Sequence, residues 1–137
     1  MRENLDILIK NTLEHCFHNG LLKETTMPGY VIEVPASRAH GHLATNLAMT
    51  LASSQKRAPR DIAKTIVDNF IDPGHFLEKI DIAGPGFINF TISRLEWLKE
   101  LKRIIDLDKE YGAAPAKRDE SVLVEYVSAN PTGPLHL

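Results

Sequence analysis

Cysteine, aromatic residues and long apolar runs are scarce or missing in this 137-residue sequence. The single cysteine, Cys16, excludes a disulfide within the chain and fits a reducing cytoplasm. No apolar run approaches the roughly 20 residues that a membrane-spanning helix needs. The N-terminal residues also lack the basic-then-apolar order of a secretory signal. We therefore expect a cytoplasmic protein with no membrane partner.

An excess of one charge is missing too, since 16 Lys and Arg stand against 18 Asp and Glu. This balance excludes strong, unspecific phosphate binding by the whole surface, although a local basic patch is still compatible with it. Two histidine pairs, His15 with His18 and His40 with His42, come without a cysteine or carboxylate set at zinc spacing. We expect no metal site.

Apolar periodicity predicts an α+β fold over residues 1–111, in which helices pack a small antiparallel sheet. Apolar residues at helical steps predict helices over 3–19, over 45–55 and from Pro59 to about residue 71. β-rich runs predict strands over 30–34, 76–83 and 87–92. The intervening Gly84-Pro85-Gly86 makes the last two a hairpin.

A fourth helix is predicted to follow Ser93. The spacing of Ser93 and Glu96 is that of a capping box. Five apolar residues recur at helical steps behind it, and we expect them to form its buried face: Leu95, Leu98, Leu101, Ile104 and Ile105.

The C-terminal segment differs in character. Residues 112–120 read as a linker, and the near-continuous apolar run over 122–127 is typical of a central parallel strand. A Pro- and Gly-containing loop follows, and ligands of open α/β sheets bind at such strand ends. His136 near a helix start could donate to a phosphate. A plain surface turn remains the alternative reading of this loop.

The segment 124–137, which reads Val-Glu-Tyr-Val-Ser-Ala-Asn-Pro-Thr-Gly-Pro-Leu-His-Leu, closely resembles the first catalytic motif of arginyl-tRNA synthetases. These class I enzymes activate arginine with ATP and magnesium and transfer it to tRNA. His136 and Leu137 match the first half of the family's His-x-Gly-His signature. The resemblance implies a catalytic His136, with ATP contacts by Thr132, Gly133, Pro134 and His136 and arginine contacts by Glu125, Ser128 and Asn130. Glu125 could instead simply point at a neighbouring helix.

Residues 1–111 resemble the N-terminal additional domain of the same family. Three runs carry this resemblance: Ala44-Thr-Asn-Leu-Ala-Met49, Arg57-Ala-Pro59 and Ala83-Gly-Pro-Gly-Phe-Ile-Asn-Phe90. Family members usually have Gly-Asp before the first run, where this chain has Gly41-His42. The resemblance implies that the domain touches the D-loop at the tRNA elbow through Phe87 and Asn89.

Strand alternation supports the same two residues independently. Ile88, Phe90 and Ile92 share one face of the predicted strand, whereas Phe87 and Asn89 share the other. An aromatic ring beside an amide suits an unstacked base, which stacks on the ring and hydrogen-bonds the amide. Packing of Phe87 at the sheet edge is the alternative.

A basic cluster is the second candidate for contact with tRNA. Its four residues are close in sequence at a helix junction and could contact phosphates: Lys56, Arg57, Arg60 and Lys64. A solvated helix face is an equally good reading of this cluster.

We therefore predict an α+β domain (1–111), a linker (112–120) and the first strand and signature loop of a truncated Rossmann-like catalytic domain (121–137). Such a fragment of a monomeric synthetase is expected to bind tRNA, to hold no ATP and to be inactive. Detectable arginine-dependent ATP–pyrophosphate exchange would contradict the expected inactivity. The rival hypothesis is a free-standing RNA-binding or protein-interaction module without catalysis.

Overall fold

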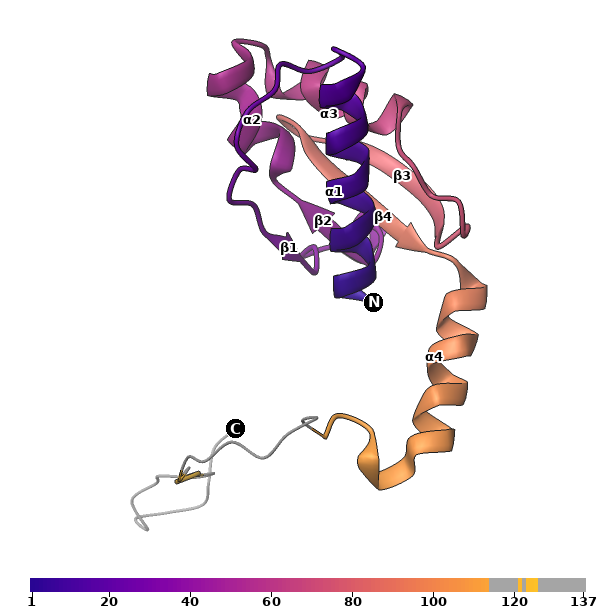
Figure 1. Ribbon diagram of the computed structural model, residues 1–137. Helices are drawn as coiled ribbons and strands as arrows, with labels where there is room; N and C mark the ends of the chain where they lie inside the picture. The colour runs from indigo at the N-terminus through magenta and orange to yellow at the C-terminus, as the bar shows by residue number, and fades with distance from the viewer. Residues whose placement is uncertain (114–120, 122, 126–137) are drawn as a thin grey trace.

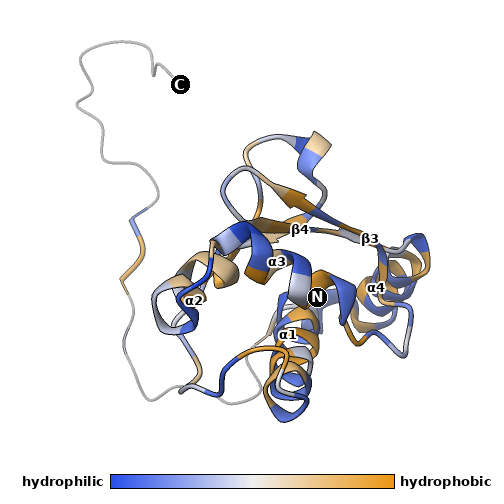
Figure 2. Cartoon of the chain, turned by 90° about the horizontal axis from the view of Figure 1, so that it is seen from above, coloured by the Kyte–Doolittle hydropathy of each residue, from blue (hydrophilic) through white to orange (hydrophobic). Residues whose placement is uncertain are grey.

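The computed structural model describes residues 1–113, 121 and 123–125, and it confirms the α+β class. Its strands form one antiparallel sheet in the order β1-β2-β4-β3. The helices α1, α2 and α3 lie against one face of this sheet (Figures 1 and 2). The helices are α1 (Arg2–His18), α2 (Leu47–Gln55), α3 (Pro59–Asp68) and α4 (Arg94–Leu107), and the strands are β1 (Ile32–Glu33), β2 (Leu43–Thr45), β3 (Leu77–Ala83) and β4 (Phe87–Ile92). Two 3₁₀ turns, Arg38–His40 and Asp108–Glu110, complete the elements.

The core lies between the sheet and the three covering helices. From β4, Ile88 and Phe90 are fully buried and Ile92 is 2% exposed, as the alternation predicts. The rings of Phe70 and Phe90 lie 5.6 Å apart between centroids. Each helix adds an apolar stripe to this core, led by Leu5, Ile9 and Leu13 of α1, Leu47 and Leu51 of α2, and Ile62 and Ile66 of α3.

The hairpin and the helices starting near residue 3 and at Pro59 are confirmed, but the strand β2 was not predicted. Leu43–Thr45 is only three residues long and all three are buried, so it carries no period-two signal. At the start of α2, the Leu47 amide donates to the Thr45 Oγ1 at 3.3 Å. The Thr45 hydroxyl donates to the Val31 carbonyl at 2.8 Å, and the Asn46 Oδ1 accepts from the Val31 amide at 2.9 Å. These bonds hold the start of β1 beside β2.

The Gly41-His42 pair ties β2 to the end of β4. Gly41 has φ +84°, and a Cβ there would lie 2.7 Å from the Phe90 carbonyl oxygen. The His42 amide donates to that oxygen at 2.8 Å, and the His42 Nδ1 accepts from the Ile92 amide at 3.0 Å. The imidazole therefore supplies a hydrogen-bond acceptor at the end of β4.

The predicted helix after Ser93 is confirmed as α4, but its expected capping box and its expected buried face are both wrong. Ser93 is the N-cap residue, yet its side chain makes no capping bond, and its buried Oγ has no partner among the described residues. The five residues expected to be buried are exposed, from Ile104 at 39% to Ile105 at 69%. The helix projects away from the body of the domain (Figure 1). Its apolar periodicity is real, but nothing in the described part of the chain covers that face.

Little of the C-terminal segment can be compared with its prediction. Ser121 and residues 123–125 have no regular secondary structure, and Leu123 is 98% exposed. The remainder of the expected strand, and the loop residues Ser128, Asn130, Thr132, Gly133, Pro134 and His136, lie outside the described residues. Within the described ranges, no helix is both long and apolar enough to cross a membrane.

Matched leucine substitutions test the difference between core and α4. Leu51 is fully buried whereas Leu98 is 52% exposed. Leu51→Ala is expected to lower the free energy of unfolding by about 2–5 kcal/mol, because it leaves a cavity. Leu98→Ala is expected to change it by less than about 0.5 kcal/mol. Urea unfolding of both variants measures the difference, and an equal loss would contradict the exposed position of α4.

The acceptor role of His42 is tested by replacing only the accepting atom. His42→Asn and His42→Asp keep an oxygen near the position of Nδ1, so they are expected to unfold close to the wild type. His42→Leu leaves the buried Ile92 amide without a partner and is expected to cost about 1–3 kcal/mol. Thermal unfolding compares the three variants, and a leucine variant as stable as the asparagine variant would show that the bond contributes nothing.

Candidate nucleic-acid interface

The outer face of the sheet, opposite the helices, carries the predicted base-contacting residues. Strand pairing places Glu33 of β1, Ala44 of β2, Asn89 of β4 and Asp81 of β3 in one row across the sheet. Phe87 pairs with Ala83 in the neighbouring row. Because side chains alternate between faces, these residues lie on the face opposite to that of Ile88 and Phe90.

A hollow of about 360 Å³ opens on this face. The hairpin turn between β3 and β4 forms one wall, and the segment around the first 3₁₀ turn forms the other. Small side chains at Ala44 and Ala83 leave the space between the walls open. Its lining residues are Glu33, Pro35, Ala36, His40, Ala44, Ala83, Gly84, Pro85, Phe87 and Asn89.

Asn89 is the chemically unusual member of this hollow. The residue is only 5% exposed, and its side-chain amide makes no hydrogen bond within the described residues. Within the described residues, the Ser93 Oγ is the side-chain polar atom that is both sealed from solvent and without a partner. The Asn89 amide is not sealed in this way, so it still reaches solvent through the hollow. A buried amide without a partner costs free energy unless a ligand or water satisfies it. Its donor and acceptor are therefore available to a molecule in the hollow.

The structure thus brings Phe87 and Asn89 together in one concave site. Phe87 is half-buried rather than packed away, so part of its ring remains accessible beside the amide. Their role in binding tRNA stays a prediction, but the arrangement that the role requires is present. The sequence did not identify Glu33 and His40 as lining residues. They come from a strand of two residues and a 3₁₀ turn that contacts β4, and neither leaves a sequence pattern.

The N-terminal end of α3 holds the hairpin wall in place. The Arg60 Nη1 donates to the Gly84 carbonyl oxygen at 2.8 Å. Gly86 has φ +145°, and a Cβ there would lie 2.9 Å from the Pro59 carbonyl carbon. Arg60 was expected to contact phosphate, and the structure gives it a bond that fixes one wall of the hollow.

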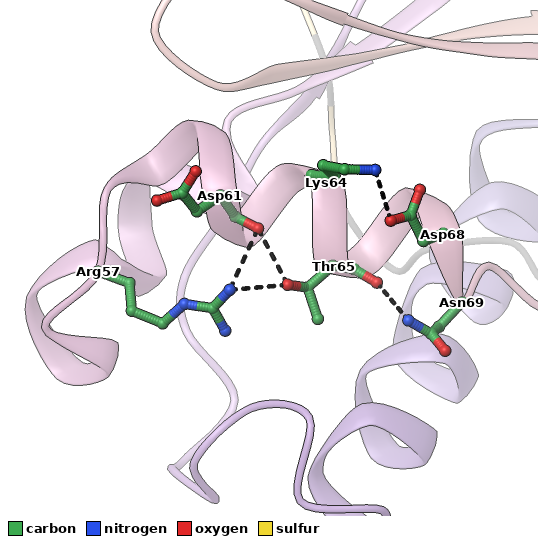
Figure 3. A network of polar contacts seen from close by, with 6 residues as sticks. All are labelled: Arg57, Asp61, Lys64, Thr65, Asp68 and Asn69. Carbon is green, nitrogen blue, oxygen red and sulfur yellow. Dashed lines mark hydrogen bonds and ion pairs between the residues drawn. The ribbon is translucent and has the colours of Figure 1, made fainter.

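The other basic residues of the predicted cluster are also largely engaged within the chain (Figure 3). The Arg57 Nη2 donates to the Thr65 Oγ1 at 2.9 Å, and the Lys64 Nζ pairs with the Asp68 carboxylate at 2.8 Å. Lys56 ends α2 with a left-handed backbone conformation. The four residues therefore do not form one patch of uncommitted charge, and phosphate contact by them remains a prediction.

The predicted arginine and ATP sites are represented by one described residue, Glu125, which is exposed and outside any helix or strand. Within the described ranges, no group of three or more His, Cys, Asp or Glu residues is placed to hold a metal ion. Among the sites predicted from the sequence, the hollow on the sheet is therefore the one that the described residues form most completely.

Comparison with known proteins identifies the relatives of this chain. The family described as arginyl tRNA synthetase N terminal domain matches residues 3–92. The arginine–tRNA ligase of Geotalea daltonii is 44% identical over the whole chain, which covers 24% of that relative. The corresponding ligase of Desulfosudis oleivorans is 46% identical, with 25% of its length covered. The chain thus spans about a quarter of the length of these curated relatives.

A solved structure shows the same fold. The crystal structure of arginyl-tRNA synthetase from Plasmodium falciparum matches with a TM-score of 0.60 at 18% identity. The match covers 74% of this chain and 18% of the other. At this identity the likeness concerns the fold alone.

Glycine substitutions test how the hairpin wall is held. Gly86→Ala is expected to destabilise the domain by about 1–3 kcal/mol, because alanine disfavours this φ and its Cβ would meet the Pro59 backbone. Gly29→Ala is the matched control, since a Cβ there meets nothing within 4 Å. Thermal and urea unfolding give the comparison, and equal stability of the two variants would mean that the turn does not press on α3.

Proposed function

The chain belongs to the arginyl-tRNA synthetase family, and we propose that it binds the elbow of tRNA for arginine through the hollow beside Phe87 and Asn89. The parent protein would attach arginine to that tRNA in the cytoplasm, using ATP and magnesium, and would act as a monomer. Membership of the family and the names of the relatives support this activity.

The observation that carries the proposal is the buried amide of Asn89, which has no partner in the described part of the chain, next to the half-buried ring of Phe87. An unpaired base of a tRNA loop can leave its stack and present a π face together with hydrogen-bonding atoms. Phe87 offers a surface for the face, and Asn89 offers a donor and an acceptor for the edge. One extruded base would satisfy both residues at the same time.

The electrostatics of the chain suit local rather than extensive contact. Net charge is −2, and three of the four candidate phosphate-binding residues already have partners in the chain. Few phosphates would be neutralised, so the affinity of this domain for tRNA would be modest, with a shallow dependence on salt. Base contact would then supply a large share of the binding free energy.

The catalytic roles are proposed from the matched sequence alone. Glu125, Ser128 and Asn130 would contact arginine. Thr132, Gly133 and Pro134 would contact ATP, and His136 would stabilise its phosphates during adenylate formation. A carboxylate is a suitable partner for a cationic substrate, and a histidine donor suits a phosphate oxygen.

A protein-interaction module without catalysis is the second candidate function. The exposed apolar face of α4 favours it, because five large apolar residues there are at least 39% exposed. That face and the hollow are different surfaces formed by different elements. Substitutions in one surface therefore separate the two candidate functions.

The tRNA-binding proposal is tested with Phe87→Ala and Asn89→Ala. Losing a stacking surface costs about 1–3 kcal/mol, so Phe87→Ala is expected to weaken binding of arginine tRNA by about 5- to 150-fold. Asn89→Ala is expected to weaken it about tenfold, because the base edge loses its partners. Leu98→Ala removes an apolar side chain from α4 and is expected to bind like the wild type. Filter binding or fluorescence anisotropy at fixed salt measures the affinities.

Two results would count against this assignment. If both hollow variants bind tRNA like the wild type while remaining folded, the site lies elsewhere. If Leu98→Ala weakens binding as much as Phe87→Ala, the contact surface includes α4.

A further inference from the structure

We propose that Glu33 determines which base the hollow accepts, by selecting a base that turns an exocyclic amino group toward its carboxylate. The inference rests on the proposed function, since it concerns the same hollow. It adds a residue that neither sequence pattern nor family resemblance identified, together with the chemical class of its ligand. Adenine, cytosine and guanine belong to this class, whereas uracil carries only carbonyl oxygens as exocyclic groups.

The position of Glu33 follows from the strand register. Glu33 pairs with Ala44, which pairs in turn with Asn89, so the two polar residues flank an alanine in one row. Two strand spacings separate their backbones by roughly 10 Å. Both residues line the hollow, and the small Ala44 between them forms part of its floor. A base edge can therefore lie between the carboxylate and the amide.

The negative charge of Glu33 limits the chemical groups of a ligand that it can bind. Its carboxylate makes no ion pair or hydrogen bond within residues 1–113, 121 and 123–125, whereas Asp81 at the far end of the row is paired with Lys79 at 2.7 Å. An unpaired carboxylate repels phosphate, so Glu33 lowers affinity for the RNA backbone. A base amino group, which presents two N–H donors, is a partner through which this side chain can favour RNA binding.

Hydrogen-bonding capacity then fixes the class of base. An ionised carboxylate can only accept, so it needs an N–H donor opposite. A carbonyl oxygen in that position would face it with no proton between them, which leaves both groups desolvated and unpaired. Uracil has one ring N3–H, but it lies between two such oxygens, whereas an exocyclic amino group presents two N–H donors at the edge of the base. Asn89 can both donate and accept, so it adapts to whatever lies beside the amino group. Glu33 would therefore select among bases, whereas Asn89 would contribute affinity for any base that is bound.

The experiment compares arginine tRNA transcripts in which each unpaired D-loop base is replaced in turn by uracil. For the wild-type chain, one amino-bearing base is expected to be sensitive, and its replacement weakens binding about tenfold, the size expected for one charge-assisted hydrogen bond. Glu33→Gln keeps the shape and adds a donor that can meet a carbonyl oxygen. It is expected to reduce this preference to within about threefold.

The control is Glu14→Gln, which removes the same charge from the exposed surface of α1. It is expected to leave the preference for the amino-bearing base unchanged. If Glu33→Gln strengthens binding of all transcripts by the same factor, Glu33 acts only through general charge and the proposal is wrong. Thermal unfolding confirms that both variants are folded before the affinities are compared.

Failure of this proposal can be told apart from failure of the proposed function. If Phe87→Ala weakens binding but no uracil replacement matters to the wild type, the hollow binds tRNA without the selectivity assigned to Glu33. If Phe87→Ala and Asn89→Ala bind every transcript like the wild type, the hollow is not the tRNA site, and both proposals fall together.

Discussion

The alternation of side chains along β4 is the constraint on which this domain depends. One set of residues, Ile88, Phe90 and Ile92, fills the core beneath the helices and fixes the register of the strand. A shift by one residue would expose all three and bury their neighbours, which makes such a shift strongly unfavourable. Since the register is fixed, the residues of β4 on the outer face of the sheet are fixed in position as well. The core therefore places Phe87 and Asn89 in the hollow.

The N-terminus of α3 links the core to the wall of the hollow. Ile62 and Ile66 anchor this helix under the sheet, while its first residues meet the hairpin turn. Arg60 bonds to the turn at Gly84, and Gly86 lies against Pro59 because it lacks a side chain. A movement of α3 would therefore displace the wall beside Phe87. Residues on the helical side of the sheet can thus influence binding on the other side without touching a ligand.

The sequence predicted those elements whose periodic apolar residues are the ones that the structure buries. The hairpin and the helix starting at Pro59 satisfy this condition, and so does the placement of Phe87 and Asn89 on the same face of β4. Helical periodicity in α4 was equally clear, but a periodic stripe says only that a face is apolar and not that something covers it. The strand β2 and the residues Glu33 and His40 belong to segments too short for a period. Their positions depend on pairing partners far along the chain, which local patterns do not encode.

Asn89 shows how the fold and the candidate function compete at one position. An apolar side chain at this place in the sheet would need no hydrogen bonds, whereas the Asn89 amide depends on water or a ligand in the hollow for its own. Thr45 and Asn46, which are also polar and close to the same sheet, meet that need with hydrogen bonds inside the domain. Asn89 has no such bond within the described residues. A ligand in the hollow would supply it in place of water, so this position serves the candidate site rather than the packing of the core.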